Sequence, residues 1–309
     1  MTLELEAPDG VGEIVSGTDL VAEITGVLDL SDGDIVVITS KVISKSEGRL
    51  LPFDSPIDRD AAIDAETVRE VARRGPVRIV ENRLGLVMAA AGVDASNIAA
   101  GTLALLPLDP DATARSLREE FTARLDVNVA VLIADTAGRA WRIGQTDIAI
   151  GLAGLDPYEN FEGRVDSYGN ELAVTAPAIA DEIAGAAELA SSKLGARPFI
   201  RVRGLKDRVL PRGEHGPGAR ALQRSPAEDL FNLGSRDAVI AAMAVTQPWS
   251  PTASPKEVES ALVRCGLRTE QQDDRIRVTG DDQELWRAGV IARVHGWVPG
   301  ATSGEFVKP

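Results

Sequence analysis

Polar side chains gather directly after an apolar segment, at Thr39-Ser40-Lys41 and again at Ser44-Lys45. The apolar segment, residues 34–39, is rich in β-branched residues and predicts a buried strand. Open α/β sheets bind their ligands at the carboxyl ends of the strands. Two ammonium groups and several hydroxyls at such an end suit a triphosphate. An exposed polar turn has the same composition, so this segment alone does not decide between the two.

A second apolar segment, residues 127–134, ends in Asp135-Thr136, and Gly138, Arg139, Arg142 and Gly144 follow closely. Carboxylate and hydroxyl oxygens bind hard divalent cations, and guanidinium groups bind phosphate or carboxylate with two parallel hydrogen bonds. We therefore predict that Asp135 is a catalytic and metal-binding residue, with Arg139 and Arg142 contacting phosphate or a substrate carboxylate. The alternative is that Asp135 only caps the following segment.

Two further segments are weaker candidates. Asp94 and Asn97 lie in Gly92-Val-Asp-Ala-Ser-Asn97 and offer a carboxylate and a carboxamide for a cation or a phosphate, but an Asx-turn or helix N-cap is the commoner use of such a pattern. The glycine-rich segment 212–220 carries Glu214 and resembles any solvated loop when taken alone.

Several site classes are excluded by what the sequence lacks. The chain has two histidines, His215 and His295, and one cysteine, Cys265, and it contains no HExxH, GxSxG, CxxC or GxxxxGK[ST] pattern. A zinc hydrolase, a serine hydrolase of the nucleophile-elbow type and a P-loop nucleotide site are therefore not expected. One cysteine allows no intrachain disulfide, which is consistent with a reducing compartment.

The net charge and the N-terminal residues limit the kinds of partner that the protein can bind. The 309 residues carry a formal net charge of −14, which repels nucleic acid but still allows one small phosphorylated ligand held by metal ions or by placed cations. The first twenty residues are acidic, unlike a targeting peptide, and no apolar run is long enough to cross a bilayer. We expect a cytoplasmic protein that binds neither nucleic acid nor membrane.

The elements that must position these residues follow from hydrophobic spacing and turn signals. The segment from Gly138 to Asn170 and residues 204–226 are expected to be loops, and a domain boundary is expected near 234–252. The remaining pattern predicts a mixed α/β fold with strands at 34–39, 77–80, 127–134, 199–202 and 275–279, and helices at 64–75, 112–125, 177–194, 236–246, 255–265 and 282–294.

Taken in order, these segments resemble the F420-0:γ-glutamyl ligase family. The matching stretches run from about residue 10 to residue 233, and the whole set is specific although no single piece is. They are Thr39–Arg49, Glu81–Leu86, Gly92–Asn97, Ala134–Arg139, Asp166–Leu172, Ala180–Ile183, Arg203–Leu205 and Glu228–Phe231.

The resemblance implies a two-lobed α/β fold, an intertwined homodimer, and GTP-dependent addition of L-glutamate to coenzyme F420-0 through a γ-glutamyl amide linkage. An acyl phosphate would form on the way, and GDP and phosphate would be released. It further implies two divalent cations, Mg²⁺ or Mn²⁺, with room for a monovalent cation such as K⁺. By position, Asp94 and Asp135 would hold one metal, while Thr136 and Glu214 would serve the second. The GTP site would comprise Val11, Gly12, Glu13, Ile14, Ser40, Lys45 and Asn97, closed over by Gly213, Gly218, Ala219 and Arg220.

Residues 1–234 would then form the catalytic domain and residues 235–309 a small accessory α/β domain of unknown role. This tail holds Trp249, Trp286 and Trp297, which predicts a core of its own, and it is too short for the nitroreductase-type domain fused to some relatives, so no flavin reductase activity is expected. Two alternatives remain open. One is a nucleotide-dependent carboxylate–amine ligase that uses another acceptor, and the other is a non-catalytic GTP-binding or scaffold protein.

Overall fold

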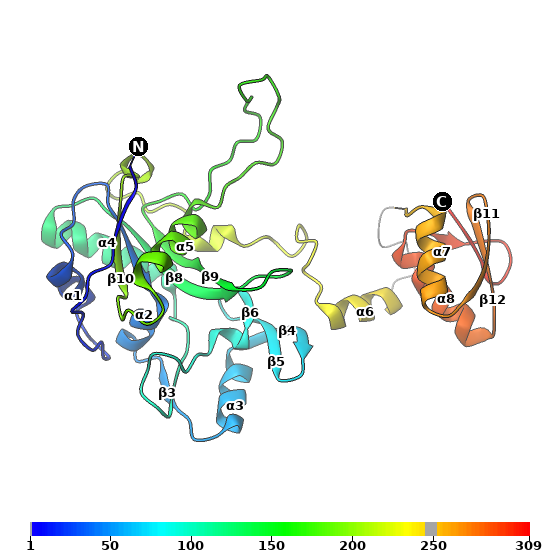
Figure 1. Cartoon of the computed structure of the whole chain (residues 1–309), viewed down its shortest axis with the longest axis horizontal. Coiled ribbons are helices and arrows are strands. Elements are labelled where there is room, and N and C mark those ends of the chain that lie inside the picture. Colours follow the sequence, from blue (N-terminus) through cyan, green and yellow to red (C-terminus); the bar gives the residue numbers. More distant parts are fainter. Residues whose placement is uncertain (1, 245–251) are drawn as a thin grey trace. The chain divides into compact units, whose positions relative to one another are not determined.

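The computed structural model describes residues 2–244 and 252–309. They form two compact units, Met1–Asp229 and Leu230–Pro309, which are described separately below. Figure 1 shows the helices and strands of both units along the chain. Among the described residues, no helix is both long enough and apolar enough to span a bilayer.

The larger unit is built on a five-stranded sheet with the order β1-β10-β2-β8-β9. The pair β2–β8 is parallel, and all other neighbours are antiparallel. The strands are β1 (Glu4–Glu6), β2 (Ile35–Thr39), β8 (Ala130–Gly138), β9 (Gln145–Ala153) and β10 (Phe199–Arg203).

Alternation along β2 and β8 divides their side chains between two cores, because successive residues of a strand face opposite sides of the sheet. Val36 and Ile38 pack with α1 and α4, whereas Ile35 and Val37 pack with α5. The sheet is thus covered by helices on both faces, which is why its central strands are apolar throughout. The helices of this layer are α1 (Leu20–Val27), α2 (Ser40–Ser46), α4 (Pro110–Leu125) and α5 (Ile179–Ser191).

A second, smaller core lies between β2 and α4 in the sequence and is formed by residues such as Ile63, Val80 and Leu103. The prediction of a helix at 64–75 was wrong for most of its length, because the helix ends at Glu66 and the next eight residues pair with β5. The elements here are β3 (Leu50–Pro52), α3 (Pro56–Glu66), β4 (Thr67–Arg74), β5 (Val77–Asn82), β6 (Val87–Ala89), the 3-10 turn η1 (Ala90–Gly92) and β7 (Thr102–Ala104).

The segment between β9 and α5 forms a long arm that leaves the body of this unit (Figure 1). Backbone hydrogen bonds join its two sides, from Phe161 N to Thr175 O and from Leu172 N to Arg164 O. The segment after β10 carries two short 3-10 turns, η2 (Lys206–Arg208) and η3 (Ala219–Leu222). The prediction of a loop from Gly138 to Asn170 therefore holds for this arm. It was wrong for Gln145–Ala153, which form β9.

The smaller unit has its own core around the fully buried Trp297, as expected from the tryptophans of the tail. Trp286 is half exposed, and Trp249 lies outside the described residues. An antiparallel sheet of order β11-β12-β14-β13 packs with α7 and α8. Its elements are α6 (Ser235–Ala244), α7 (Pro255–Arg264), β11 (Arg268–Gln272), β12 (Arg275–Thr279), α8 (Asp282–Val294), β13 (Val298–Pro299) and β14 (Glu305–Val307).

The mixed α/β class is confirmed, as are the main strands and helices expected around the central sheet. The last two residues of the helix expected at 236–246 lie outside the described part of the chain. Strands β11, β13 and β14 were missed, because β11 is polar and almost wholly exposed, and β13 and β14 are only two and three residues long.

Candidate functional site

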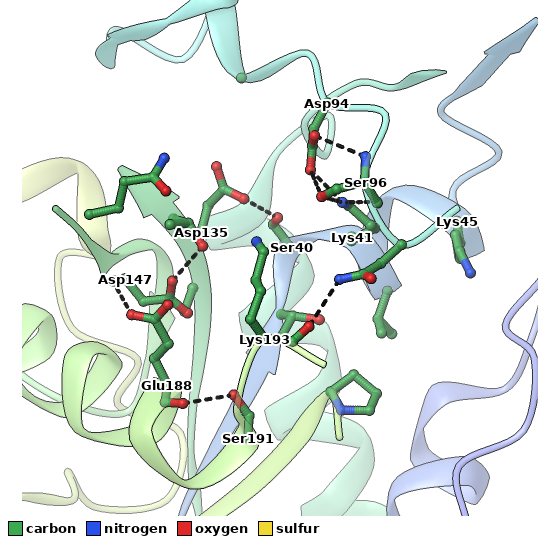
Figure 2. Close-up of a pocket in the computed structure, with 18 of the residues that line it drawn as sticks. Ser40, Lys41, Lys45, Asp94, Ser96, Asp135, Asp147, Glu188, Ser191 and Lys193 are labelled. Atoms are coloured by element: carbon green, nitrogen blue, oxygen red, sulfur yellow. Dashed lines mark hydrogen bonds and ion pairs between the residues drawn. The ribbon is translucent and has the colours of Figure 1, made fainter. Parts of the chain in front are cut away.

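The carboxyl end of β2 lies beside the middle of the parallel strand β8, with Thr39 opposite Ala134. The next residue on each segment is polar: Ser40 begins α2, and Asp135 continues β8. Ser40 Oγ donates a hydrogen bond of 2.6 Å to Asp135 Oδ1. Two segments 95 residues apart in the sequence therefore meet through their side chains, as Figure 2 shows.

Asp135 lies in the wall of a cavity and is partly covered by its neighbours. Burial raises the pKa of Asp135 to about 6, and the negative charges of Asp147 and Asp94 add to this effect against the hydrogen bond from Ser40. A carboxylate that is costly to ionise beside other acids is stabilised when it binds a cation or a proton.

Asp94 approaches the same cavity from the loop after η1. Gly92 permits this loop, because it has φ +81° and a Cβ there would lie 2.6 Å from Leu106 Cδ1. Burial works to raise the pKa of Asp94, but hydrogen bonds from Lys41 and Ser96 outweigh it and bring the pKa to about 2. Lys41 Nζ lies 2.5 Å from Asp94 Oδ2 (Figure 2).

A third group of acids comes from β9 and α5. Antiparallel pairing places Thr136 opposite Asp147, and Thr136 Oγ1 donates to Asp147 Oδ1 over 2.7 Å. The backbone N–H of Asp147 donates to Glu188 Oε2 at 3.3 Å. Burial raises the pKa of Asp147, and the nearby charge of Glu188 raises it further.

The cavity measures about 810 Å³ and is lined by segments from across the larger unit. Lys45 Nζ binds Glu13 Oε1 at 2.6 Å on one side, and Asn97 Nδ2 donates to the carbonyl of Lys193 at 3.4 Å on another. Its wall includes Val11, Gly12, Glu13, Ile14, Ser40, Lys45, Asp94, Asn97, Asp135 and Thr136, which are ten of the residues singled out from the sequence.

The sequence of this unit matches known proteins over most of its length. The model of the family described as F420-0:Gamma-glutamyl ligase matches residues 10–204. The chain belongs to this family.

Curated relatives agree with the family match. A coenzyme F420:L-glutamate ligase from Methanopyrus kandleri is 37% identical over 247 residues, which cover 74% of this chain and 98% of the relative. One from Archaeoglobus fulgidus is 38% identical and covers 66% of this chain and 89% of the relative. A third, from Natronomonas pharaonis, is 34% identical over 212 residues.

Not every residue singled out from the sequence lies at the cavity. Arg139 and Arg142 are exposed on the turn between β8 and β9, where Arg139 Nη2 donates to the carbonyl of Ile143 at 3.1 Å. Their contact with phosphate or substrate therefore stays a prediction.

The segment expected to close over GTP packs against α4 instead of lining this cavity. The Asp111 carboxylate accepts the backbone N–H of Ala219 at 2.7 Å, and the carbonyl of Glu214 accepts a hydrogen bond from Arg118. These contacts place Gly213, Glu214, Gly218, Ala219 and Arg220 outside the cavity wall of this chain. Their roles toward nucleotide and metal stay predictions as well.

The donor set fits a divalent cation that arrives with phosphates. Asp94, Asp135 and Thr136 offer oxygens to one cavity, and Mg²⁺ is commonly held by one or two carboxylates together with substrate phosphates and water. Within residues 2–244 and 252–309, no group of three or more His, Cys, Asp or Glu side chains is arranged as a metal cage.

Four polar residues of the cavity wall were given no role from the sequence. The place of Asp147 depends on the β8–β9 pairing, which sets it opposite Thr136 and was not predicted. The unassigned residues are Ser96, Asp147, Glu188 and Lys193, whereas Lys41 was named with Lys45 as an ammonium group suited to phosphate.

The raised pKa of Asp135 gives a stability prediction for the metal-free protein. Because the folded-state pKa of about 6 exceeds the ordinary value of 3.8, ionisation of Asp135 costs folding free energy that builds up as the pH rises from 3.8 to about 6 and is constant above that. Asp135→Asn removes this cost. The free energy of unfolding of the variant, relative to the parent, should therefore increase by about 1–2 kcal/mol when the pH is raised from 5 to 8. Urea unfolding of both proteins in chelator-treated buffer measures the difference, and a difference independent of pH contradicts the assignment.

Proposed function

We propose that this chain joins L-glutamate to coenzyme F420-0 in an amide linkage, using GTP and divalent cations. The supporting observation is that four separate segments of the chain, around residues 11–14, 39–45, 93–97 and 134–138, line one cavity where carboxylates and ammonium groups lie together. The family and its curated relatives support the acceptor and the amino acid. Their names specify neither the nucleotide nor the intermediate, which are part of this proposal.

A carboxylate is a poor acyl donor because its oxygen is a poor leaving group, so an amide ligase must first activate it. In the proposed reaction the F420-0 carboxylate oxygen attacks the γ-phosphorus of GTP and displaces GDP, which gives an acyl phosphate. The glutamate amine then attacks the acyl carbon, loses a proton, and displaces inorganic phosphate. Charge that builds up on the transferred phosphoryl group must be neutralised in the transition state.

The protein groups have distinct parts in this scheme. Asp94, Asp135 and Thr136 would hold the cations, which supply Lewis-acid stabilisation of the phosphates when bound. Lys45 and the backbone around Gly12 lie where the nucleotide would be held, since both line the cavity. Ser40 fixes the orientation of the Asp135 carboxylate through its hydrogen bond. As in the resemblance, we further propose a homodimer and two divalent cations.

The decisive experiment incubates the purified chain with GTP, Mn²⁺, L-glutamate and F420-0 and follows product mass. Addition of a glutamyl unit together with release of GDP and phosphate is the expected result. Replacement of GTP by ATP tests the nucleotide, and omission of glutamate tests whether phosphate release requires the amine. A mass change only with a different acceptor indicates a related amide ligase, and nucleotide binding without phosphate release indicates a scaffold.

A further inference from the structure

Lys41 has the most completely engaged ammonium group in the cavity wall. It lies in the first turn of α2, beside Ser40, and only 20% of its side chain is exposed. Its Nζ donates to Asp94 Oδ2 at 2.5 Å, to Ser96 Oγ at 3.1 Å and to the Ser96 carbonyl. An ammonium group has three donors, and all three are used here.

The Asp94 carboxylate accepts three hydrogen bonds, although 48% of its side chain is exposed. Besides Lys41, Oδ2 accepts the Ser96 hydroxyl at 2.5 Å, and Oδ1 accepts the Ser96 backbone N–H at 3.0 Å. The Lys41 ammonium therefore lies against Oδ2, one of the two oxygens that Asp94 could offer a divalent cation. Two cations cannot both contact this oxygen closely, because their mutual repulsion at such distances is large.

We propose that Lys41 is a positioning residue that competes with the divalent cation for Asp94 and so makes cation binding depend on the nucleotide. This inference rests on the proposed function. Lys41 lines the same cavity as Asp94 and Lys45, so phosphate oxygens entering it offer the ammonium a new partner. The nucleotide then frees Asp94 for the cation, and cation and nucleotide bind together with positive coupling.

The chain provides a matched control. Lys45 lies one helical turn further along α2, lines the same cavity and is also ion-paired, but its partner is Glu13 at 2.6 Å. Lys41→Met and Lys45→Met each remove one positive charge from the cavity. Only Lys41→Met removes a competitor from Asp94, so the control separates direct competition from a general change in charge.

The test is titration of nucleotide-free protein with Mn²⁺, with free Mn²⁺ measured by electron paramagnetic resonance. We expect Lys41→Met to bind Mn²⁺ about tenfold more tightly than the parent. Lys45→Met should differ from the parent by less than about threefold, because Lys45 makes its ion pair with Glu13 and not with Asp94. Equal affinities for the two variants overturn the proposal. Circular dichroism and thermal unfolding check both folds, and Lys41→Gln repeats the test with a polar side chain.

A second titration adds a non-hydrolysable GTP analogue and includes Asp94→Asn. The analogue should tighten Mn²⁺ binding by a larger factor in the parent than in Lys41→Met, and equal factors contradict the role of Lys41. If Asp94→Asn binds Mn²⁺ as tightly as the parent, the metal site itself fails, and with it the proposed function. If Asp94→Asn weakens binding while Lys41→Met matches Lys45→Met, the proposed function stands and only the competition fails.

Discussion

Substitution of Asp135 by Asn should lower the turnover of the ligase about a thousandfold or more while leaving the fold intact. The amide has nearly the shape of the carboxylate, so packing at the end of β8 is retained. It lacks the negative charge that would hold a divalent cation beside the phosphates, and electrostatic stabilisation of a transferring phosphoryl group is among the largest contributions to such reactions. Initial rates of glutamyl transfer under saturating GTP and Mn²⁺ measure the effect.

Two further variants make this result specific. Asp282→Asn changes an exposed acid in α8 of the smaller unit and should leave the rate near that of the parent. The double variant Asp94→Asn/Asp135→Asn should be little worse than either single variant, because residues that serve one ion act as a unit. Near-normal turnover of Asp135→Asn removes this residue from the metal site.

Substitution of Arg118 by Met should lower the free energy of unfolding by about 3–5 kcal/mol, the largest stability effect that we expect from a single side chain of this protein. Arg118 projects from α4 and is only 2% exposed. Burial lowers the pKa of its guanidinium, and the negative charge of Glu214 acts in the opposite direction. Arginine stays protonated in proteins, so a positive charge is buried here. Its hydrogen-bond acceptors are the carbonyls of Val129, Leu210, Pro211 and Glu214 and the side chain of Asn128.

Methionine fills part of the same space but leaves several of these carbonyls without a donor, which is costly in a buried site. The segment around residues 210–215 should therefore loosen first, and amide hydrogen exchange there should rise more than in the central sheet. Arg115→Met on the same helix is the control, because Arg115 is exposed and such changes stay within about 0.5 kcal/mol. Equal stabilities of the two variants in urea contradict this account.

The sequence predicted the part of the site that local pattern can reveal. A strand rich in β-branched residues followed at once by Ser40, and another followed by Asp135, was enough to place both at one edge of a sheet. The position of Asp147 could not be found this way, because it depends on a hairpin whose second strand contains Gly151. This glycine looks like a loop signal, yet a Cβ there would lie 2.5 Å from the carbonyl oxygen of Pro110, so it marks a close approach to α4.

The failure at residues 67–74 has a different cause. This segment has helix-forming residues and a helical spacing, which local propensity favours, but Thr67 and Val71 are also good strand residues. Pairing with β5 along Thr67–Arg74 decides the outcome, and that pairing is a tertiary contact. The segment 213–220 shows the same limit, since its attachment to Asp111 and Arg118 has no signature in its own sequence.

The place of β10 in the central sheet has a consequence for biosynthesis of the protein. This strand lies between β1 and β2, although it is made some 160 residues after β2. At about 5–20 residues per second, one edge of β2 stays open on the ribosome for roughly ten to thirty seconds, and β1 has no neighbour during that time. An apolar strand with an unpaired edge invites aggregation. Nascent chains should therefore depend on chaperones until residue 203 has emerged, and expression at lower temperature should increase the yield of folded enzyme.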